Sequence, residues 1–285
     1  MSKERQKVTA ADLRARIAER VQRLAGLVDA AKRSDEMRTY LAFCARFHRY
    51  SFNNVMLICA QRPGATHVAG YKTWQKLGRQ VRKGERGIAI LAPVTFRRRD
   101  PETGEATGAT GLTFRTAWVF DVSQTEGDPL PEVRWLAEGQ DGAALADALR
   151  AYAASLGIAV RDADTGGAGG VSKGGAIDLS ADLAPLGRAA VLAHELAHEL
   201  LHRDPAVRAT TTRAQREHQA EAVAYVVLAH FGHDLPSSGV YLALWDADAA
   251  TLQANLEAVQ RAAGQIIGAL EAPGVAPVAA RQAEG

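Results

Sequence analysis

The feature that most constrains this chain is an apolar run from Val191 to His202 that contains the pattern His-Glu-x-x-His. The run lacks proline and glycine and is rich in leucine and alanine, so it predicts a largely buried helix. His194 and His198 are four positions apart, which places both on one helix face, about 6 Å apart along the axis. Two imidazoles in this arrangement are typical zinc ligands. Glu195 points about 100° away around the helix. From there a carboxylate can reach a zinc-bound water, so we predict that Glu195 is the catalytic base of a metallopeptidase.

The alternative to a zinc site is a pair of histidines on an amphipathic surface, with hydrogen-bond partners and no metal. The aliphatic residues of the same run argue against it, because they bury the helix, and buried His and Glu side chains need partners. A second, more polar helix follows and can supply a further ligand.

A catalytic zinc site needs a third protein ligand and one position open to water. His202 lies eight residues after His194, about 12 Å along a helix, so we expect it at the surface or in a supporting position. Glu217 and Glu221 share a face of a helix predicted over 216–225. We expect one to bind zinc and the other to orient a histidine. Glu221 is the preferred ligand because it lies between alanines and leads into valines. The choice stays open, since either residue could also belong to a pair on a solvated face.

The charge distribution divides the chain into two parts. Residues 1–100 contain 22 Lys and Arg against 8 Asp and Glu, a balance of +14, while the rest contains 12 against 24, a balance of −12. Such a basic N-terminal region indicates a nucleic-acid binder. An Arg-rich composition alone would give the same excess throughout. We therefore expect a basic domain over 1–128 and a metallopeptidase-like domain over 129–270, followed by a disordered tail over 271–285.

Hydrophobic periodicity and turn residues predict an α+β fold: an N-terminal domain of helices with a small sheet and a C-terminal zincin-like domain. In the first domain, helices are expected over 10–24, 34–44, 52–61 and 72–77, and strands over 66–70, 88–96 and 114–122, with a flexible hairpin tip over 97–111. In the second, helices are expected over 142–156 and 248–270, and strands over 157–161 and 176–180. The glycine-rich residues 166–175 are expected to be a turn, and 176–180 an edge strand that lines the cleft beside the zinc helix.

Residues 71–87 combine aromatic rings, cations and glycines, the combination that holds single-stranded nucleic acid. Rings stack on bases at about 1–3 kcal/mol per base, and cations contact phosphates. The candidate DNA-binding residues of this segment are Tyr71, Trp74, Arg79, Arg82, Lys83 and Arg86. Trp74 could instead be a core residue, and Arg82 with Lys83 could be merely solvated. Duplex binding is less expected, because no helix shows the pattern of a recognition helix.

Four motifs carry a resemblance to a known family: Tyr50-Ser-Phe-Asn-Asn54, Tyr71-Lys-Thr-Trp74, Gly78-Arg-Gln-Val-Arg-Lys-Gly-Glu-Arg-Gly-Ile88 and Val119-Phe-Asp-Val-Ser-Gln-Thr125. They are similar to motifs of the ArdC antirestriction family. Its members join a single-stranded-DNA-binding domain to a zinc metallopeptidase-like domain similar to the ImmA/IrrE group. The resemblance spans roughly residues 8–265.

The resemblance implies a plasmid or mobile-element protein that shields incoming single-stranded DNA from host restriction during conjugation. Carried over by motif, it places the zinc ligands on His194, His198 and Glu221 and the catalytic carboxylate on Glu195. It also adds Asn53 to the candidate DNA-binding residues.

The expected partners are therefore single-stranded DNA and a protein substrate, and the expected cofactor is Zn²⁺. No apolar run reaches membrane-spanning length and the polar start is no secretory signal, so a cytoplasmic location and no membrane partner are expected. Cys44 and Cys59 are expected to be reduced core residues. The alternative function is an ImmA/IrrE-like regulatory protease that cleaves a repressor, with DNA binding incidental.

Overall fold

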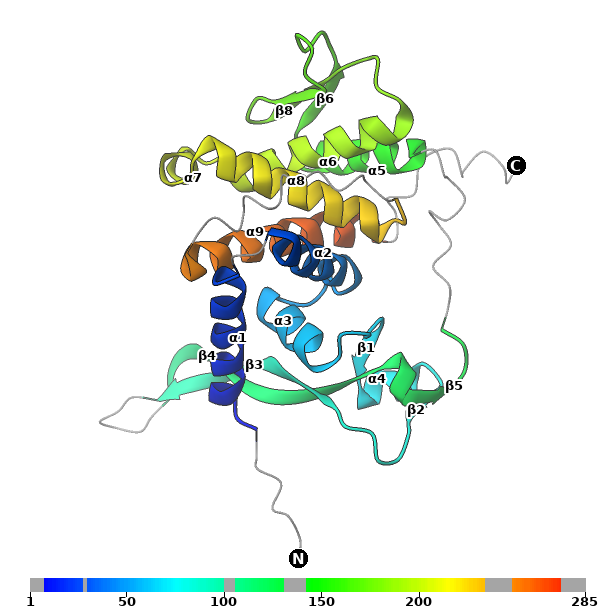
Figure 1. Cartoon of the computed structure of the whole chain (residues 1–285), viewed down its shortest axis with the longest axis vertical. Coiled ribbons are helices and arrows are strands. Elements are labelled where there is room, and N and C mark those ends of the chain that lie inside the picture. The colour runs from blue at the N-terminus through cyan, green and yellow to red at the C-terminus, as the bar shows by residue number, and fades with distance from the viewer. Residues whose placement is uncertain (1–7, 28–29, 100–105, 131–141, 234–247, 273–285) are drawn as a thin grey trace, which may run out of the picture. The chain divides into compact units, whose positions relative to one another are not determined.

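The computed structural model describes residues 8–27, 30–99, 106–130, 142–233 and 248–272 (Figure 1). The chain forms two compact units: Met1–Arg20 with Asn53–Leu130, and Val21–Phe52 with Pro131–Gly285. The N-terminal domain expected over 1–128 is thus interrupted by a segment of the second unit. The first unit keeps a basic excess, with 17 Lys and Arg against 10 Asp and Glu, and the second carries 17 against 22. The charge asymmetry therefore has the expected sign but is smaller than the two sequence halves indicate.

The first unit is a small sheet with short helices. Its elements are the first part of α1 (Ala10–Ala25), α3 (Phe52–Gln61), β1 (Val68–Gly70), α4 (Tyr71–Lys76), β2 (Arg79–Val81), β3 (Ile88–Arg99), β4 (Ala106–Asp121), the 3₁₀ turn η1 (Val122–Gln124) and β5 (Thr125–Gly127). Strands β1, β4 and β3 form one antiparallel sheet in that order, and β2 pairs with β5.

Helix α3 completes the edge of this sheet through two side-chain amides. Asn54 donates to the Leu91 carbonyl and accepts from the Leu91 N–H, both at 2.9 Å. Gln61 makes the same pair of contacts with Ala89, at 2.8 and 3.0 Å. An edge strand leaves backbone groups unpaired, and among the described residues β3 is an edge strand. These two amides satisfy its backbone groups at Leu91 and Ala89.

The long β3–β4 hairpin differs from the expected flexible segment over 97–111. Strand β3 continues to Arg99 and β4 starts at Ala106, with a register shift between Arg97 and Arg99. The polar composition predicted a loop, but threonine and aromatic residues favour extended backbone, and the neighbouring strand supplies hydrogen bonds.

The second unit packs helices around one core and a small sheet. Its elements are α2 (Ala30–Arg46), α5 (Ala143–Ser155), β6 (Ala159–Asp162), β7 (Gly170–Ser172), β8 (Ala176–Leu179), α6 (Pro185–His202), α7 (Pro205–Thr210), α8 (Arg213–His230) and α9 (Ala249–Leu270). The sheet order is β6-β8-β7, with β6 parallel and β7 antiparallel to β8.

Apolar stripes on α5, α6, α8 and α9 make the core of this unit. Leu149, Leu192, Val223 and Ile266 are completely or almost completely buried, and each such side chain stabilises the fold by about 1.5–3 kcal/mol. Pro185 starts α6, where proline's missing N–H costs nothing. A capping box between Thr212 and Gln215 starts α8 earlier than position 216.

The position of the edge strand was predicted wrongly. Strand β8, at 176–179, lies in the middle of its sheet, and the glycine-rich run contains the edge strand β7. Cys44 and Cys59 are buried and not joined by a disulfide, as expected. Among the described residues, no helix is both long and apolar enough to cross a membrane. Residues 241–247 and the tail from 273 lie outside the described residues.

Candidate functional site

The two histidines of helix α6 bring one ring nitrogen each to a common point. Nε2 of His194 and Nε2 of His198 are 3.0 Å apart. Oε2 of Glu217, on α8, lies 3.5 Å from the first and 3.6 Å from the second. Tetrahedral zinc with bonds of about 2.0–2.1 Å holds its ligand atoms about 3.3 Å from one another. The three atoms therefore form a triangle of the right size for a small divalent cation.

Glu221 lies on the other side of the His194 ring. Its Oε2 is 3.4 Å from Nδ1 of His194, the nitrogen that faces away from Glu217. A carboxylate in that position fixes the tautomer and orientation of a metal-binding imidazole. In this geometry Glu217 completes the triangle of candidate ligand atoms, and Glu221 contacts the other ring nitrogen of His194. The two residues share a helix face, so only the packing of α8 against α6 decides which one reaches the triangle.

The charges around the triangle favour a cation. Burial alone would lower the pKa of His194, but its hydrogen bond with Glu221 and the negative charges of Glu195, Glu221 and Glu217 raise it. Burial and the neighbouring His194 lower the pKa of His198 to about 4. His198 is therefore neutral near pH 7, the form in which an imidazole binds a metal.

A chain of polar side chains orients His198 from behind. Nε2 of His202 is 2.7 Å from Oε1 of Gln219, and Gln219 donates to Oδ1 of Asn255 at 2.8 Å. Because the amide oxygen only accepts, His202 donates from Nε2, and its Nδ1 accepts from Nδ1 of His198 at 3.0 Å. This leaves the lone pair of His198 on Nε2, toward the triangle. His202 thus has the supporting position, but it is buried. Gln219 was not predicted, because only the packing of α8 shows its contact with His202.

Glu195 is held beside the triangle by strand β7. The Ser172 N–H donates to its Oε2 at 2.8 Å. A Cβ on Gly170 would lie 2.7 Å from the Val191 side chain and 2.9 Å from Cγ of Glu195, so glycine permits this close approach. Burial raises the pKa of Glu195, with His194 opposing, and a carboxyl group with a raised pKa suits proton transfer near neutral pH.

Glu199 was missed by the sequence reasoning, although it lies one turn after Glu195 on the same face. It accepts hydrogen bonds from Oγ of Ser172 at 2.7 Å and from the N–H groups of Gly174 and Gly175 at 2.8 and 2.7 Å. Its contacts fix the glycine-rich turn and hence β7. The sequence did contain a signal for this role. Glu195 and Glu199 form a second i, i+4 pair on the helix, and such a pair indicates a shared face that can bind a neighbouring backbone.

A cleft of about 880 Å³ is lined by His194, Glu195, His198, Glu217 and Glu221. Strand β7 forms one wall, and α6 and α8 form the others. Four arginines also line the cleft: Arg203, Arg208, Arg213 and Arg216. The cleft thus combines an acidic ligand cluster with cationic side chains.

In the first unit, Trp74 has the core position and not the predicted stacking position. Its side chain is only 2% exposed, and its indole N–H donates to the Phe120 carbonyl at 2.9 Å. Tyr71, three positions earlier, is exposed. Asn53 is partly buried at the start of α3.

Two of the predicted cationic residues are engaged within the fold. Arg79 donates to Oγ1 of Thr125 at 2.8 Å and to the Gly127 carbonyl at 3.1 Å. Arg82 donates to Oε1 of Glu85 at 2.9 Å and to the Ser123 carbonyl at 2.5 Å. Lys83 and Arg86 are exposed. The last two are therefore the better placed for phosphates.

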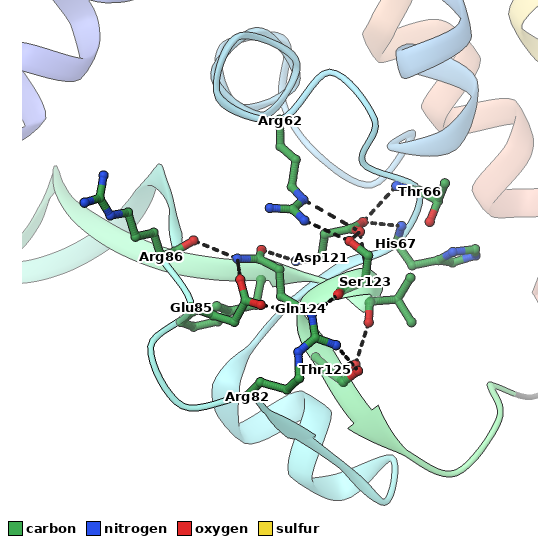
Figure 2. A network of polar contacts seen from close by, with 12 residues as sticks. Arg62, Thr66, His67, Arg82, Glu85, Arg86, Asp121, Ser123, Gln124 and Thr125 are labelled. Carbon is green, nitrogen blue, oxygen red and sulfur yellow. Dashed lines mark hydrogen bonds and ion pairs between the residues drawn. The ribbon is translucent and has the colours of Figure 1, made fainter.

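Figure 2 shows the polar network that holds the loop between β2 and β3. Buried Gln124 donates to Oε2 of Glu85 at 3.0 Å and to the Arg86 carbonyl at 2.8 Å. The buried Asp121 carboxylate accepts from the N–H groups of Thr66 and Ser123, at 2.8 and 3.0 Å. The motif from Val119 to Thr125 therefore positions and stabilises the loop over 82–87, which contains Arg82, Lys83 and Arg86 and is called the basic loop below.

Trp118, among the described residues, is an exposed indole that the sequence reasoning missed. Its side chain is 49% exposed, and it lies beside the basic loop, since a Cβ on Gly87 would be 3.2 Å from it. Strand alternation gives the signal: Val119 and Asp121 are buried, so Trp118 faces the other side. Phe114 lies on that side too, with the Arg14 guanidinium 5.5 Å from its ring centre.

Two family models match separate parts of the chain. The N-terminal domain of the anti-restriction factor ArdC matches residues 7–120, and the IrrE N-terminal-like domain, peptidase M78, matches residues 153–229. The second match includes both histidines of α6 and both candidate glutamates of α8.

The chain is also similar to solved structures and to a curated relative. The metal-free crystal structure of the antirestriction protein ArdC from plasmid R388 is 24% identical, with a TM-score of 0.51 over 78% of this chain and 84% of that one. The Mn(II)-bound structure is 22% identical, with a TM-score of 0.46 over 81% of this chain and 98% of that one. An uncharacterized protein of Bacillus anthracis is 26% identical over 270 residues, 80% of this chain. The match spans 46% of that relative's length.

Proposed function

Because this chain belongs to the ArdC-like antirestriction family and carries an IrrE-like peptidase domain, we propose that it is a plasmid or mobile-element antirestriction protein with two activities. Its first unit binds single-stranded DNA, and its second unit hydrolyses peptide bonds at a zinc centre. The observation that carries the catalytic part is the ligand triangle with Glu195 beside it in one cleft.

His194, His198 and Glu217 would hold the zinc ion. Two imidazoles and one carboxylate are one of the donor sets of catalytic zinc sites, which keep a further position open. Glu221, His202 and Gln219 would act through the histidines, because each contacts an imidazole or its partner. Such supporting residues typically change metal affinity by about 10–100-fold.

The residues around the triangle suit the hydrolysis of an amide. A zinc ion bound there would supply Lewis-acid polarisation of the scissile carbonyl and acidify water. Glu195 accepts a proton from the attacking water and passes it to the leaving amine. The Ser172 N–H fixes Oε2, so Oε1 is the oxygen that carries the proton.

Strand β7 offers a binding edge for an extended peptide. Its pairing with β8 directs the backbone groups of Val171 toward β8. The N–H of Ser172 points away from β8, to Glu195, and strand alternation gives Gly170 the same outward direction. A substrate strand beside Gly170 would thus lie along the cleft by strand addition.

The proposal for the first unit rests on exposed rings beside exposed cations. Trp118 and Tyr71 would stack on bases, and Lys83 and Arg86 would contact phosphates. Arg79 and Arg82 would mainly stabilise the fold, because their guanidinium groups donate to the carbonyl groups of Gly127 and Ser123.

The catalytic proposal is tested with a mixture of quenched fluorescent peptides and the zinc-loaded full chain. We expect cleavage by the wild type and a loss of about 10²–10⁴-fold in Glu195→Gln, with zinc content unchanged. Glu257→Gln, in α9 and outside the cleft, is the matched control and should cleave normally. Equal cleavage by Glu195→Gln would disprove the assigned role, and no cleavage by any variant would leave the second unit without this activity.

A further inference from the structure

A second cluster of metal-binding side chains lies at the opposite end of α8 from the cleft. His48 follows α2, His230 is the last residue of α8, and Glu271 follows α9. Nε2 of His48 is 3.0 Å from Oε2 of Glu271, and Nε2 of His230 is 3.0 Å from Oε1 of the same carboxylate. Three potential ligand atoms, one from each residue, lie within 4.8 Å of one another. Three segments distant in the sequence thus meet at one carboxylate.

The hydrogen bond behind His230 determines what its front nitrogen can do. Nδ1 of His230 is 2.7 Å from the Ala45 carbonyl. A carbonyl only accepts, so Nδ1 carries the proton, and a neutral ring then has its lone pair on Nε2. That lone pair faces a carboxylate oxygen at 3.0 Å, which is repulsive unless a cation lies between them. The cation is either a second proton on the ring or a metal ion.

The surroundings of the cluster resemble those of metal-binding residues in general. A metal-binding histidine commonly donates its other N–H to a backbone carbonyl, as His230 does, and a binding carboxylate commonly accepts a further hydrogen bond. Arg49 donates to Oε2 of Glu271 at 2.9 Å. Its guanidinium is the one cation facing the carboxylate among the described residues besides the two histidines, and it is 75% exposed, so a metal could share the carboxylate with it.

His48 is ready to bind a cation. Its side chain is only 7% exposed, and its Nδ1 is buried without a hydrogen-bond partner among the described residues. Its Nε2 faces Oε2 of Glu271 at 3.0 Å, so the ring can supply one nitrogen to a cation held beside that carboxylate.

The backbone that carries His48 is held in place by α9. Gln260 donates to the carbonyls of Phe47 and Tyr50, at 3.2 and 3.0 Å. A Cβ on Gly264 would lie 2.5 Å from the His48 carbonyl, so glycine allows the helix to come this close. The position of His48 is therefore built into the packing of the second unit.

We propose that His48, His230 and Glu271 form a second site for a zinc-class divalent cation, separate from the cleft, that fastens the end of α2 to the ends of α8 and α9. Its role is structural, because no catalytic carboxylate comparable to Glu195 stands beside it in the described residues. The cation would join the segment around His48, which comes from the N-terminal part of the sequence, to the peptidase-like unit. This site does not depend on the proposed function of the cleft.

The test measures the zinc content and the Co²⁺ absorption spectrum of the full chain after equilibration with each metal. We expect two zinc equivalents in the wild type and one in the double variant His194→Asn/His198→Asn. Adding Glu271→Gln to that double variant should remove the remaining equivalent, and adding Glu257→Gln instead should leave it. The double variant should also keep the d–d absorption of Co²⁺ bound by nitrogen and oxygen ligands.

The proposal is wrong if the double variant holds no zinc and gives no Co²⁺ absorption. The contact between His230 and Glu271 would then be an ordinary polar pair without a metal. Circular dichroism checks the fold of the Glu271→Gln chain, and the Co²⁺ spectrum of the double variant gives the answer even if that chain unfolds. One equivalent that survives both Glu271→Gln and His48→Asn would also contradict the assignment.

Discussion

Glu217 and Glu221 differ by one helical turn, yet their carboxylates meet opposite nitrogens of one imidazole. We therefore expect unequal effects of the same substitution. Glu217→Gln should abolish stoichiometric zinc binding in the cleft, because it removes a charged ligand. Glu221→Gln should weaken it by about 10–100-fold, as loss of an orienting partner does. Competition with a chromophoric chelator, in a Glu271→Gln background, measures both. Equal losses, or the greater loss in Glu221→Gln, would restore Glu221 as the ligand.

Trp118 and Trp74 allow a second test at the same scale. Trp118→Ala should weaken single-stranded-DNA binding by about 1–3 kcal/mol without destabilising the fold, because the ring is exposed. Trp74→Ala should cost about 3–5 kcal/mol of stability, as truncation of a buried aromatic does. Anisotropy titrations and urea unfolding separate the two effects. The interpretation fails if Trp118→Ala binds as the wild type does.

Sequence periodicity was sufficient to predict that His194 and His198 share one face, because the helix alone sets that relation. It was insufficient to choose between Glu217 and Glu221, since the contacts of each carboxylate with His194 depend on how two helices pack. It also failed for Trp74, which the aromatic and cationic pattern placed among the stacking residues. The ring is buried, and its N–H donates to the Phe120 carbonyl from a strand distant in sequence.

The network around Asp121 gives a prediction at the scale of elements. Burial opposes its charge, but hydrogen bonds from Ser123, Thr66 and His67 outweigh burial and lower the pKa below its ordinary value of 3.8. A lowered folded-state pKa stabilises the protein fully above the unfolded pKa, and this contribution is lost as pH falls through the folded pKa. Asp121→Asn should thus destabilise the first unit by about 1–3 kcal/mol at pH 7. The difference from the wild type should shrink below pH 4.

Urea unfolding of the two proteins between pH 2.5 and 7 measures this difference, with Asp128→Asn, which lies at an exposed position after β5, as the control. A constant difference across that range would mean that the carboxylate charge does not hold the turn.

Strand β7 shows why some elements could be predicted from the sequence and others could not. Helices such as 52–61 were predicted to the residue, since their periodicity and stop signals are local. The glycine run was assigned to a turn that connects strands. In the structure, Gly170 is required where β7 approaches Val191 and Glu195, a tertiary constraint that no local propensity contains.

At the scale of the whole molecule, the division into units differs from the expected boundary because residues 21–52 belong with the C-terminal part. Charge and linker composition describe positions along the sequence. Neither shows that residues 21–52 pack with the C-terminal part of the chain. That grouping follows from tertiary packing, because α2 contacts α8 and α9.

The central claim is that DNA binding and the metal centre belong to different units of one chain. The most direct measurement is a fluorescence-anisotropy titration of a labelled single strand and its matching duplex with the full chain, at two salt concentrations. The account predicts a preference for the single strand that weakens with salt, falls in Trp118→Ala and is unchanged in Glu195→Gln. Equal or negligible binding of the two DNAs, or a loss of binding in Glu195→Gln, would contradict it.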